Sequence, residues 1–542
     1  MNEDYTIVGI DFGTSTTVVR VRNYYVDGRS VQTKALLDDF NGRDNFATVI
    51  LERKNGVRKY GHEADEASGR RLDDGDVVHR NFKVDLISPD VGRRDRAKAL
   101  TREFLSFVCQ KLEGQRYNLE LLNTVVAVVS VPAKWPKDVR DFMRSVVVEA
   151  GFVADASQVR IVDEPTAASR ATLTSHLPDL MKDRVVGLGR YNVMMVDMGA
   201  GTTDLAVFKL QIGQQGDMQV DSIVTFPTVD NPNLCGGREI DACLCAHACD
   251  AGGEFAVKNR RQVEYIVKKF KENLLSPQLR NNERCLWKDE FFFDRDEFSR
   301  LNDIDRKVFE DLTKRHWRDW WNVVGGALSA AHRMIDVGPE DIDLLILTGG
   351  HSFWYCAEEL FLGKSLGGIA PLPFAKLQAE PCRILTESNR SATVALGLAL
   401  ADAVLPFVPT STNGYALKLS IPGCEASQMR TIVEPNEELP VSRMLEYALD
   451  LAGGEMRSMV PVRVELYCGN QSKSMRLAAR TDVEVKTPEH FDPNLPLRMM
   501  AVLDANVDVD YGLSAEGAVT ALYVENGTLS GNFNVTNIKV NI

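Results

Sequence analysis

Residues 196–205 read VDMGAGTTDL, and residues 9–19 read GIDFGTSTTVV. Each stretch follows an apolar run and places an aspartate, Asp11 or Asp197, directly before a turn rich in glycine and threonine. Glycine lets the backbone come close to an anion, so that successive N–H groups point at it. The repeated stretch therefore predicts two phosphate-binding hairpins, each with a carboxylate at its mouth.

The predicted phosphate contacts are the glycines and the small residues of the two turns. They are Gly13, Thr14, Ser15, Thr16, Gly199, Ala200, Gly201, Thr202 and Thr203. Asp11 and Asp197 would repel a bare phosphate, so we expect a cation between them and the phosphate. Mg²⁺ binds few carboxylates directly and keeps several waters, so these aspartates are expected to hold its hydration shell. Two such turns facing each other would clamp a triphosphate from both sides.

Composition and charge limit the kinds of partner. The 542 residues carry a formal net charge of -13, with 44% hydrophobic and 26% charged residues. The acidic balance argues against a general electrostatic interaction with nucleic acid or anionic lipid. No run of 18 apolar residues predicts a transmembrane helix, and residues 1–13 do not resemble a signal peptide. We expect a cytoplasmic protein, with access to the nucleus left open.

Hydrophobic patterning predicts an α/β fold over most of the chain. Residues 123–132, NTVVAVVSVP, form a continuous apolar run typical of a strand buried on both faces, and residues 136–151 have helical spacing. Another long helix is expected over residues 305–336, and strands alternate with helices throughout. The sequence thus predicts one large α/β unit over residues 1–404.

The pattern changes after residue 404. Residues 405–413 contain two prolines and several small polar residues, which predicts a linker. Beyond it, short alternating stretches such as VPVRVELYCG predict strands without helices. We therefore expect a smaller β-sandwich over residues 414–542.

Four possible metal ligands lie close together in CLCAHAC: Cys243, Cys245, His247 and Cys249. Thiolate and imidazole are ligands that zinc prefers. Their spacing of two residues winds around a helix, however, so four ligands would not converge on one ion. Buried thiols on a core helix are the favoured interpretation, and the 10 cysteines of so long a chain fit reduced thiols better than disulfides.

The two turns and an ordered series of further segments resemble the actin-like ATPase superfamily, and within it the seventy-kilodalton heat-shock chaperones. The similar segments of residues 1–404 are SVPAKWPKDVRDFMRSVVVEAGF, RIVDEPTAAS, CGGREID, LLILTGGHS and SNRSATVALGLAL. More remotely, RTIVEPNEELPVS, VRVELYCGN and VLDANVDV resemble the β half of the family's peptide-binding domain. The resemblance implies a two-lobed actin-like ATPase domain followed by a β-sandwich.

The resemblance also implies catalytic roles. Asp11, Asp197 and Glu164 would hold Mg²⁺ through water, and Asp204 would complete the acidic ring. Lys83 would steady the γ-phosphate and the attacking water, since phosphoryl transfer depends mainly on positioning and charge. Pro132 and Arg140 match a switch proline and a relay arginine that link the nucleotide state to the second domain.

The expected contacts with the adenosine end lie in three further segments. They are Gly236, Gly237, Lys269, Glu272, Asn273, Gly349, Gly350, His351 and Phe353. Several residues here depart from the family pattern, because His351 replaces a serine, Phe353 an arginine and Ser391 an aspartate. Phe353 can still stack on a base, whereas the ionic contact is lost. We expect nucleotide binding with altered affinity and a looser preference for the base.

The leading hypothesis is a heat-shock-chaperone-like ATPase that binds ATP or ADP with Mg²⁺ and hydrolyses ATP slowly. Its β domain would hold a protein or peptide client, without a helical lid, and a cochaperone or nucleotide-exchange factor would assist. The alternative is a nucleotide-gated interaction protein with little or no ATPase activity. A sugar or metabolite kinase is disfavoured because no segment supplies a convincing general-base aspartate. An actin-like filament protein is disfavoured because it has no use for the β domain.

Overall fold

A computed structural model of the chain describes most of the residues before 401 and eight strands after 413. The described residues are 4–28, 31–70, 72–132, 135, 137–213, 218–226, 235–248, 260–285, 304–400, 414–420, 427–434, 441–447, 459–469, 476–486, 497–503, 521–526 and 529–533. The predicted linker at 405–413 lies outside them. The part of the chain that is described has mixed α/β structure with several sheets.

The first large sheet is built on the hairpin that contains residues 9–19. Strands β1 (Tyr5–Phe12) and β2 (Thr16–Tyr24) pair antiparallel, and β8 (Val125–Val131) and β9 (Val159–Asp163) extend the sheet in parallel. The strand order is β3-β2-β1-β8-β9, with β4 also paired to β2. The apolar run at 123–132 thus forms a central strand, as predicted.

The second large sheet repeats this arrangement around residues 196–205. Strands β10 (Gly189–Met198) and β11 (Thr203–Ile212) form the hairpin, and β13 (Leu344–Thr348) and β14 (Ile384–Thr386) are the parallel strands. The order is β12-β11-β10-β13-β14, with β12 spanning Met218–Phe226. The repeated sequence therefore corresponds to a repeated unit of structure, with an aspartate at the end of the first strand of each hairpin.

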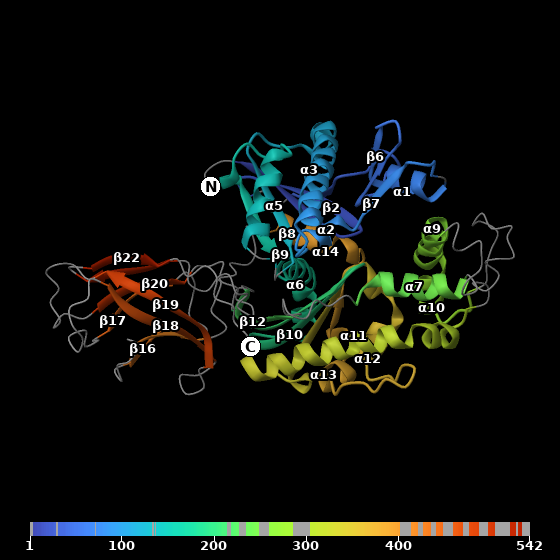
Figure 1. The fold of residues 1–542 in the computed structure, drawn as a ribbon. Helices are drawn as coiled ribbons and strands as arrows, with labels where there is room; N and C mark the ends of the chain where they lie inside the picture. Colours follow the sequence, from blue (N-terminus) through green and yellow to red (C-terminus); the bar gives the residue numbers. More distant parts are fainter. Residues whose placement is uncertain are drawn as a thin grey trace.

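Two helices lie between the large sheets (Figure 1). Helix α6 (Glu164–Lys182) and helix α14 (Thr393–Ala399) contribute Ala167, Leu173 and Leu398 to a core shared with β8, β10 and β13. The helices cross closely, because a Cβ on Gly397 would overlap the backbone of Ala167.

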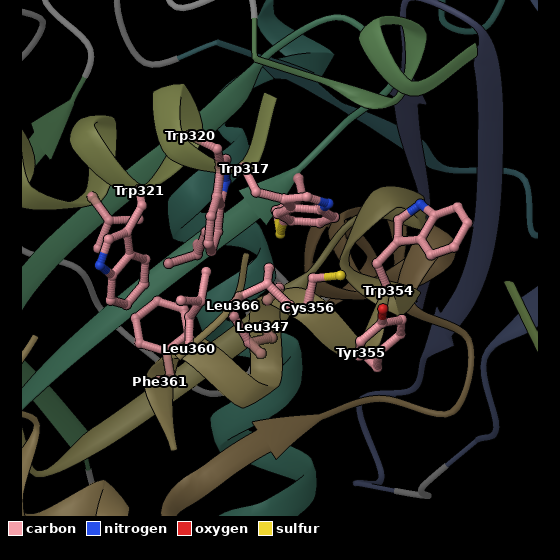
Figure 2. Packing of buried hydrophobic residues seen from close by; sticks show 14 of the residues in the cluster. Trp317, Trp320, Trp321, Leu347, Trp354, Tyr355, Cys356, Leu360, Phe361 and Leu366 are labelled. Atoms are coloured by element: carbon pink, nitrogen blue, oxygen red, sulfur yellow. The ribbon is translucent and has the colours of Figure 1, made fainter. Parts of the chain in front are cut away.

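The outer faces are covered by further helices. Helices α3 (Val91–Gly114) and α5 (Lys137–Glu149) pack on the first sheet. On the second sheet, α11 (Arg306–Ile335) begins at the predicted position, because Asp305 caps its first turn by accepting a hydrogen bond from the Val308 N–H. It packs with α7 (Gly237–Ala248), α9 (Arg260–Phe270) and α12 (Tyr355–Phe361) in a core that includes four tryptophans, Trp317, Trp320, Trp321 and Trp354 (Figure 2).

The remaining elements are short. They are β3 (Lys34–Ala35), β4 (Phe46–Ala47), β5 (Val49–Glu52), β6 (Arg58–Tyr60), α1 (Gly61–Arg70), β7 (Val77–Arg80), α2 (Phe82–Asp85), α4 (Arg116–Leu119), η1 (Ala156–Gln158), η2 (Lys271–Leu275), α10 (Ser276–Arg280), η4 (Pro339–Asp341), η5 (Gly350–Phe353), α13 (Ala375–Ala379), η6 (Pro381–Arg383) and η7 (Arg390–Ala392). Strands β6, β5 and β7 form a small third sheet. None of the helices in the described residues is long and apolar enough to cross a membrane.

Every element described after residue 413 is a strand. The strands are β15 (Gly414–Ser420), β16 (Ser427–Val433), β17 (Val441–Tyr447), β18 (Met459–Gly469), β19 (Arg476–Lys486), β20 (Leu497–Leu503), β21 (Ala521–Asn526) and β22 (Leu529–Phe533). They form two four-stranded sheets, β16-β15-β18-β19 and β17-β20-β21-β22, and β16 contacts both β17 and β20 of the second sheet.

Candidate functional site

The two glycine turns face each other. A Cβ on Gly201 of the second turn would lie 3.6 Å from the methyl group of Thr14 in the first. The second turn is closed by a hydrogen bond from the Gly199 N–H to the Thr202 carbonyl, at 2.9 Å. The antiparallel pairing of β10 and β11 brings Asp197 opposite Asp204. The structure thus brings together the two predicted phosphate turns and their carboxylates.

A lysine and a glutamate from distant segments complete this end of the site. Lys83 of α2 and Glu164, the first residue of α6, are both buried, and the Lys83 Nζ lies 2.6 Å from Glu164 Oε1. The Lys83 ammonium also lies over the rings of Phe12 and Trp135, 5.9 and 5.5 Å from their centroids. A buried lysine held in this way can present one positive charge at a fixed position, as phosphoryl transfer needs.

Burial and mutual repulsion raise the pKa values of the two aspartates. Desolvation, followed by the charge of Glu164, raises the pKa of Asp11 to about 6, although Lys83 and a hydrogen bond from Ser130 oppose the rise. The pKa of Asp197 is raised well above its usual value by burial and then by Glu164, Asp204 and Asp11. Burial lowers the pKa of Lys83, but Glu164 and Asp11 outweigh it, and the net shift is upward. The site is therefore short of positive charge and holds its lysine protonated.

The carboxylates suit a hydrated cation. The Asp197 carboxylate has no hydrogen-bond donor among the described residues, and a Cβ on Gly349 would overlap its Oδ1. In the part of the chain that the structure describes, no group of three or more His, Cys, Asp or Glu residues could itself hold a metal ion. The donor set therefore fits an ion that keeps its own waters, which is how Mg²⁺ is usually bound.

The hydroxyl of Thr203, a predicted phosphate contact, forms a hydrogen bond within the protein. The Thr203 hydroxyl, which is buried, donates to the Cys235 carbonyl at 2.5 Å. A hydroxyl has one proton to donate, and the Thr202 hydroxyl likewise donates to Asp204, so the phosphate contacts expected of the two hydroxyls stay predictions. Thr202 remains at the mouth of the turn, 3.3 Å from Asp204 Oδ2.

Gly236 and Gly237 pack against the second glycine turn. The Gly237 N–H donates to the Gly199 carbonyl at 3.1 Å, and a Cβ on Gly236 would lie 2.6 Å from the Ala200 carbonyl oxygen. Beyond Gly237 lie His351 Nδ1 and Lys271 Nζ, 3.3 and 3.5 Å from the position of a Cβ on that glycine. The structure thus brings Gly236, Gly237 and His351 together, and their contact with the adenosine end of a nucleotide stays a prediction.

Three other predicted residues lie on α9 and η2. Glu272 and Asn273 are exposed on η2, a single π-helical turn. The Lys269 ammonium lies over the ring of Tyr265, and the charge of Asp65 on α1 acts on it. Their contacts with a nucleotide stay predictions. Lys271, which the sequence did not single out, is buried, pairs with Asp241 at 2.6 Å and donates to the Gly237 carbonyl at 3.4 Å.

Phe353 keeps a cationic neighbour that the sequence did not predict. Its side chain is 38% exposed, and the Arg390 guanidinium carbon lies 5.0 Å from the ring centroid. Arg390 is fixed by a hydrogen bond of 2.5 Å to the Ser352 carbonyl. A guanidinium over an aromatic face is a favourable pair, so Arg390 helps to hold the Phe353 ring in place.

The proposed relay residues lie beside the lysine. The Arg140 guanidinium pairs with Asp163, next to Glu164, at 3.0 Å and donates to the Trp135 carbonyl at 2.9 Å. The Trp135 N–H in turn donates to the Pro132 carbonyl. These bonds connect Pro132 and Arg140 to the strand that carries Glu164 into the site.

The cysteine-rich segment lies on α7, where Cys243 and Cys245 are half-buried and form no disulfide. Cys249 lies outside the described residues. The thiols are less buried than predicted, because α7 turns one face only to the core, which Leu244 and Ala248 fill.

Comparisons with known proteins give the site a context. The Hsp70 protein family matches residues 78–353. The matched range contains Lys83, Glu164, Asp197 and His351. The chaperone protein HscA homolog of Rickettsia typhi is 25% identical over 291 residues, which cover 51% of this chain and 43% of that protein. The chain therefore spans less than half the length of this curated relative.

Proposed function

Because the chain belongs to the Hsp70 family, we propose that it binds Mg-ATP between its two glycine turns and hydrolyses it slowly. The observation that carries this proposal is the buried ion pair of Lys83 and Glu164 beside Asp11, Asp197 and Asp204. These groups come from four separate segments and converge where the two turns meet. An acidic ring of this kind lowers stability unless a cationic ligand offsets it, which is typical of a functional site.

In the proposed reaction, the backbone N–H groups of Gly13, Gly199 and Gly201 would bind phosphate oxygens. Lys83 would hold the γ-phosphate and the attacking water, and Glu164 would fix the lysine and orient that water. Asp11, Asp197 and Glu164 would hold Mg²⁺ through its waters, and this ion would neutralise the charge of the phosphates. Asp204 would close the ring beside Thr202.

We further propose the division of the chain into residues 1–404, a linker at 405–413 and a β-sandwich at 414–542. The two four-stranded sheets after residue 413 support a β-sandwich, since β16 of one sheet contacts β17 and β20 of the other. Under this proposal, the sandwich holds a protein or peptide client, and the nucleotide state changes its affinity. Cochaperones or exchange factors, and a cytoplasmic location, belong to the same proposal.

The test is single-turnover hydrolysis of labelled ATP by the full chain, with Lys83→Ala in parallel. Lys364→Ala is a matched control, since Lys364 is 61% exposed and pairs with Glu359 on the surface. We expect the wild type and the control to convert bound ATP to ADP, and Lys83→Ala to bind ATP but convert it about 10³-fold more slowly. Equal turnover in all three proteins would refute the assignment of Lys83.

The outcome also separates the two hypotheses. If wild type binds ATP and does not convert it, the chain is a nucleotide-gated interaction protein. If it does not bind ATP at all, the proposed nucleotide site is wrong.

A further inference from the structure

Two buried histidines meet close to Gly237. His351 follows the glycine turn after β13, and His316 lies on α11. Each is 5% exposed, and their Nε2 atoms lie 3.1 Å apart. The His351 ring is parallel to that of Trp317, which is labelled in Figure 2, with interplanar angle 4° and centroids 5.6 Å apart.

Two imidazole nitrogens at this distance share one proton, because one must donate and the other must accept. Charging either ring is unfavourable: burial lowers the pKa of His316 to about 4, and that of His351 well below its usual value. The charged groups that act on the pair are Lys271 on η2, which is neutralised by Asp241 on α7, and Asp319 on α11. Both rings are therefore neutral near pH 7, and the position of the shared proton fixes both tautomers.

The Nδ1 atoms of the two rings decide which histidine donates the shared proton. His316 Nδ1 is buried without a hydrogen-bond partner. If His351 donated the shared proton, His316 would bury an N–H donor with no acceptor, and such orphan donors are rarer in proteins than orphan acceptors. If His316 donates instead, its Nδ1 is a bare acceptor, and the proton of His351 is on Nδ1.

His351 Nδ1 has no hydrogen-bond partner among the described residues. It lies beside Gly237, where a Cβ would approach it to 3.3 Å, at the end of the row of glycines that starts at the phosphate turns. A nucleotide whose phosphates lie in those turns would direct its base toward this nitrogen.

We propose that His316 is a positioning residue that holds the proton of His351 on Nδ1, and that this N–H donates a hydrogen bond to an acceptor atom of the bound nucleotide base. The proposal rests on the proposed nucleotide site and adds to it a determinant of base recognition. A single N–H can donate to a ring nitrogen or to an oxo group, so ATP and GTP would both satisfy it.

The test uses two variants of the full chain with opposite hydrogen-bonding character. In His316→Gln, the amide N–H₂ donates to His351 Nε2 and preserves the tautomer. In His316→Glu, the carboxylate accepts from His351 Nε2, which leaves Nδ1 bare at high pH and gives an imidazolium with both protons at low pH. ADP affinity is measured by calorimetry between pH 7 and 9, and unfolding midpoints verify that both variants fold.

We expect His316→Gln to bind ADP within about twofold of wild type. His316→Glu should bind about tenfold more weakly at pH 9, the size of one lost hydrogen bond, and regain affinity toward pH 7. Equal affinity of the two variants at every pH, with wild type binding normally, would overturn the proposal.

A direct readout is the ¹⁵N spectrum of protein labelled at its 8 histidines, with His351→Ser to assign the signal. We expect a protonated Nδ1 and a bare Nε2 in wild type, and the reverse tautomer would overturn the proposal. Since this measurement needs no ligand, it stands even if wild type fails to bind nucleotide, an outcome that would refute the proposed function instead.

Discussion

The two halves of the site have the same strand order, but the hydrogen bonds to their aspartates differ. In the first half, the hydroxyl of Ser130 on β8 donates to Asp11 Oδ1 at 2.8 Å. In the second half, Thr348 on β13 is the register partner of Asp197, yet its hydroxyl donates to the Arg390 carbonyl at 3.1 Å. Asp197 receives no hydrogen bond from any described residue.

Burial and then neighbouring carboxylates raise both pKa values, and this difference adds a smaller contribution that separates them. A donor to the charged form favours ionisation, and Asp11, which has one, reaches a pKa of about 6. Asp197 has none, faces Asp204 across the hairpin, and its pKa is raised further. A repeated sequence has thus produced one carboxylate that receives a hydrogen bond within its own half and one that receives none from the described residues.

The strongest test of the difference between Asp11 and Asp197 is to neutralise each aspartate in turn. Asp11→Asn and Asp197→Asn should each slow ATP turnover by about 10²-fold or more, because both carboxylates are proposed to position the hydrated ion. Without ligand at pH 8, both should raise the unfolding midpoint, since each removes a carboxylate whose ionised form is destabilised by burial. Asp197→Asn should raise it more.

Single-turnover hydrolysis and thermal unfolding without Mg²⁺ measure the two effects. Because the folded pKa of Asp11 is raised from 3.8 to about 6, its ionised form destabilises the ligand-free protein at high pH. If Asp11→Asn stabilises the free protein as much as Asp197→Asn does, the hydroxyl of Ser130 is not what separates the halves.

The second prediction concerns the crossing of the two helices between the halves. At this point α6 has Ala167 and α14 has Gly397, and a Cβ on the glycine would overlap the Ala167 backbone. Gly397→Ala should therefore lower the free energy of unfolding by about 3 kcal/mol, because neither backbone can move without disturbing its sheet. Chemical unfolding of the full chain measures this.

Gly325→Ala is the matched control. Gly325 is also helical, in α11, and a Cβ there would meet nothing within 4 Å. It should raise stability by about 0.5–1 kcal/mol, because alanine loses less conformational entropy in a helix. A Gly397→Ala protein as stable as wild type would contradict the close crossing of α6 and α14.

The local parts of the site could be predicted from sequence, and the long-range parts could not. The strand, aspartate and glycine turn occupy about ten consecutive residues, so the sequence alone predicts a phosphate-binding turn in both halves. The pairing of Lys83 with Glu164 spans 81 residues, and the resemblance, rather than any spacing, supplied it. His316 and Arg390 had no signal, because tertiary packing alone brings them to His351 and Phe353.

Two details of the site have simple geometric causes. Thr203 begins β11 and Thr202 directly precedes it, and neighbouring residues of an extended chain point to opposite faces, so the two hydroxyls have different partners. The sequence named Lys269, Glu272 and Asn273 but not Lys271, and one residue along a helix rotates the side chain by about 100°. The π-helical turn at η2 shifts that register again.

The third prediction sharpens the comparison between the turns. A Cβ on Gly13 would overlap the Thr16 carbonyl of its own turn, whereas one on Gly201 would make an ordinary contact, 3.6 Å from the Thr14 methyl group. Gly13→Ala should therefore distort its hairpin and lower stability. Gly201→Ala should fold normally and weaken ATP binding by about tenfold, because the methyl group would occupy space where the phosphates approach the backbone.

Calorimetric titration and unfolding midpoints separate these effects. The converse result, normal stability for Gly13→Ala and loss of stability for Gly201→Ala, would show that the first turn is the one with room for a ligand.

The fourth prediction is the dependence on pH. Asp11 has a folded pKa of about 6, above its usual value of 3.8, so its effect on stability is favourable at low pH and is lost as the pH rises through 6. Its proposed function has the opposite dependence, because the ionised form holds the hydrated ion. The kcat/KM for ATP, which reports ionisation of the free protein, should therefore increase up to tenfold per pH unit below about 6, while this group makes the ligand-free protein less stable over the same range.

The variant Ser130→Ala tests whether the hydrogen bond from Ser130 contributes to the pKa of Asp11. Without the hydroxyl that favours the ionised carboxylate, the pKa of Asp11 should rise further, by roughly half a unit to one unit for one hydrogen bond. The midpoints of the kcat/KM profile and of the stability profile should then move together to higher pH. If they stay in place, Glu164 and burial alone determine the ionisation of Asp11, and the two halves differ less than their hydrogen bonds suggest.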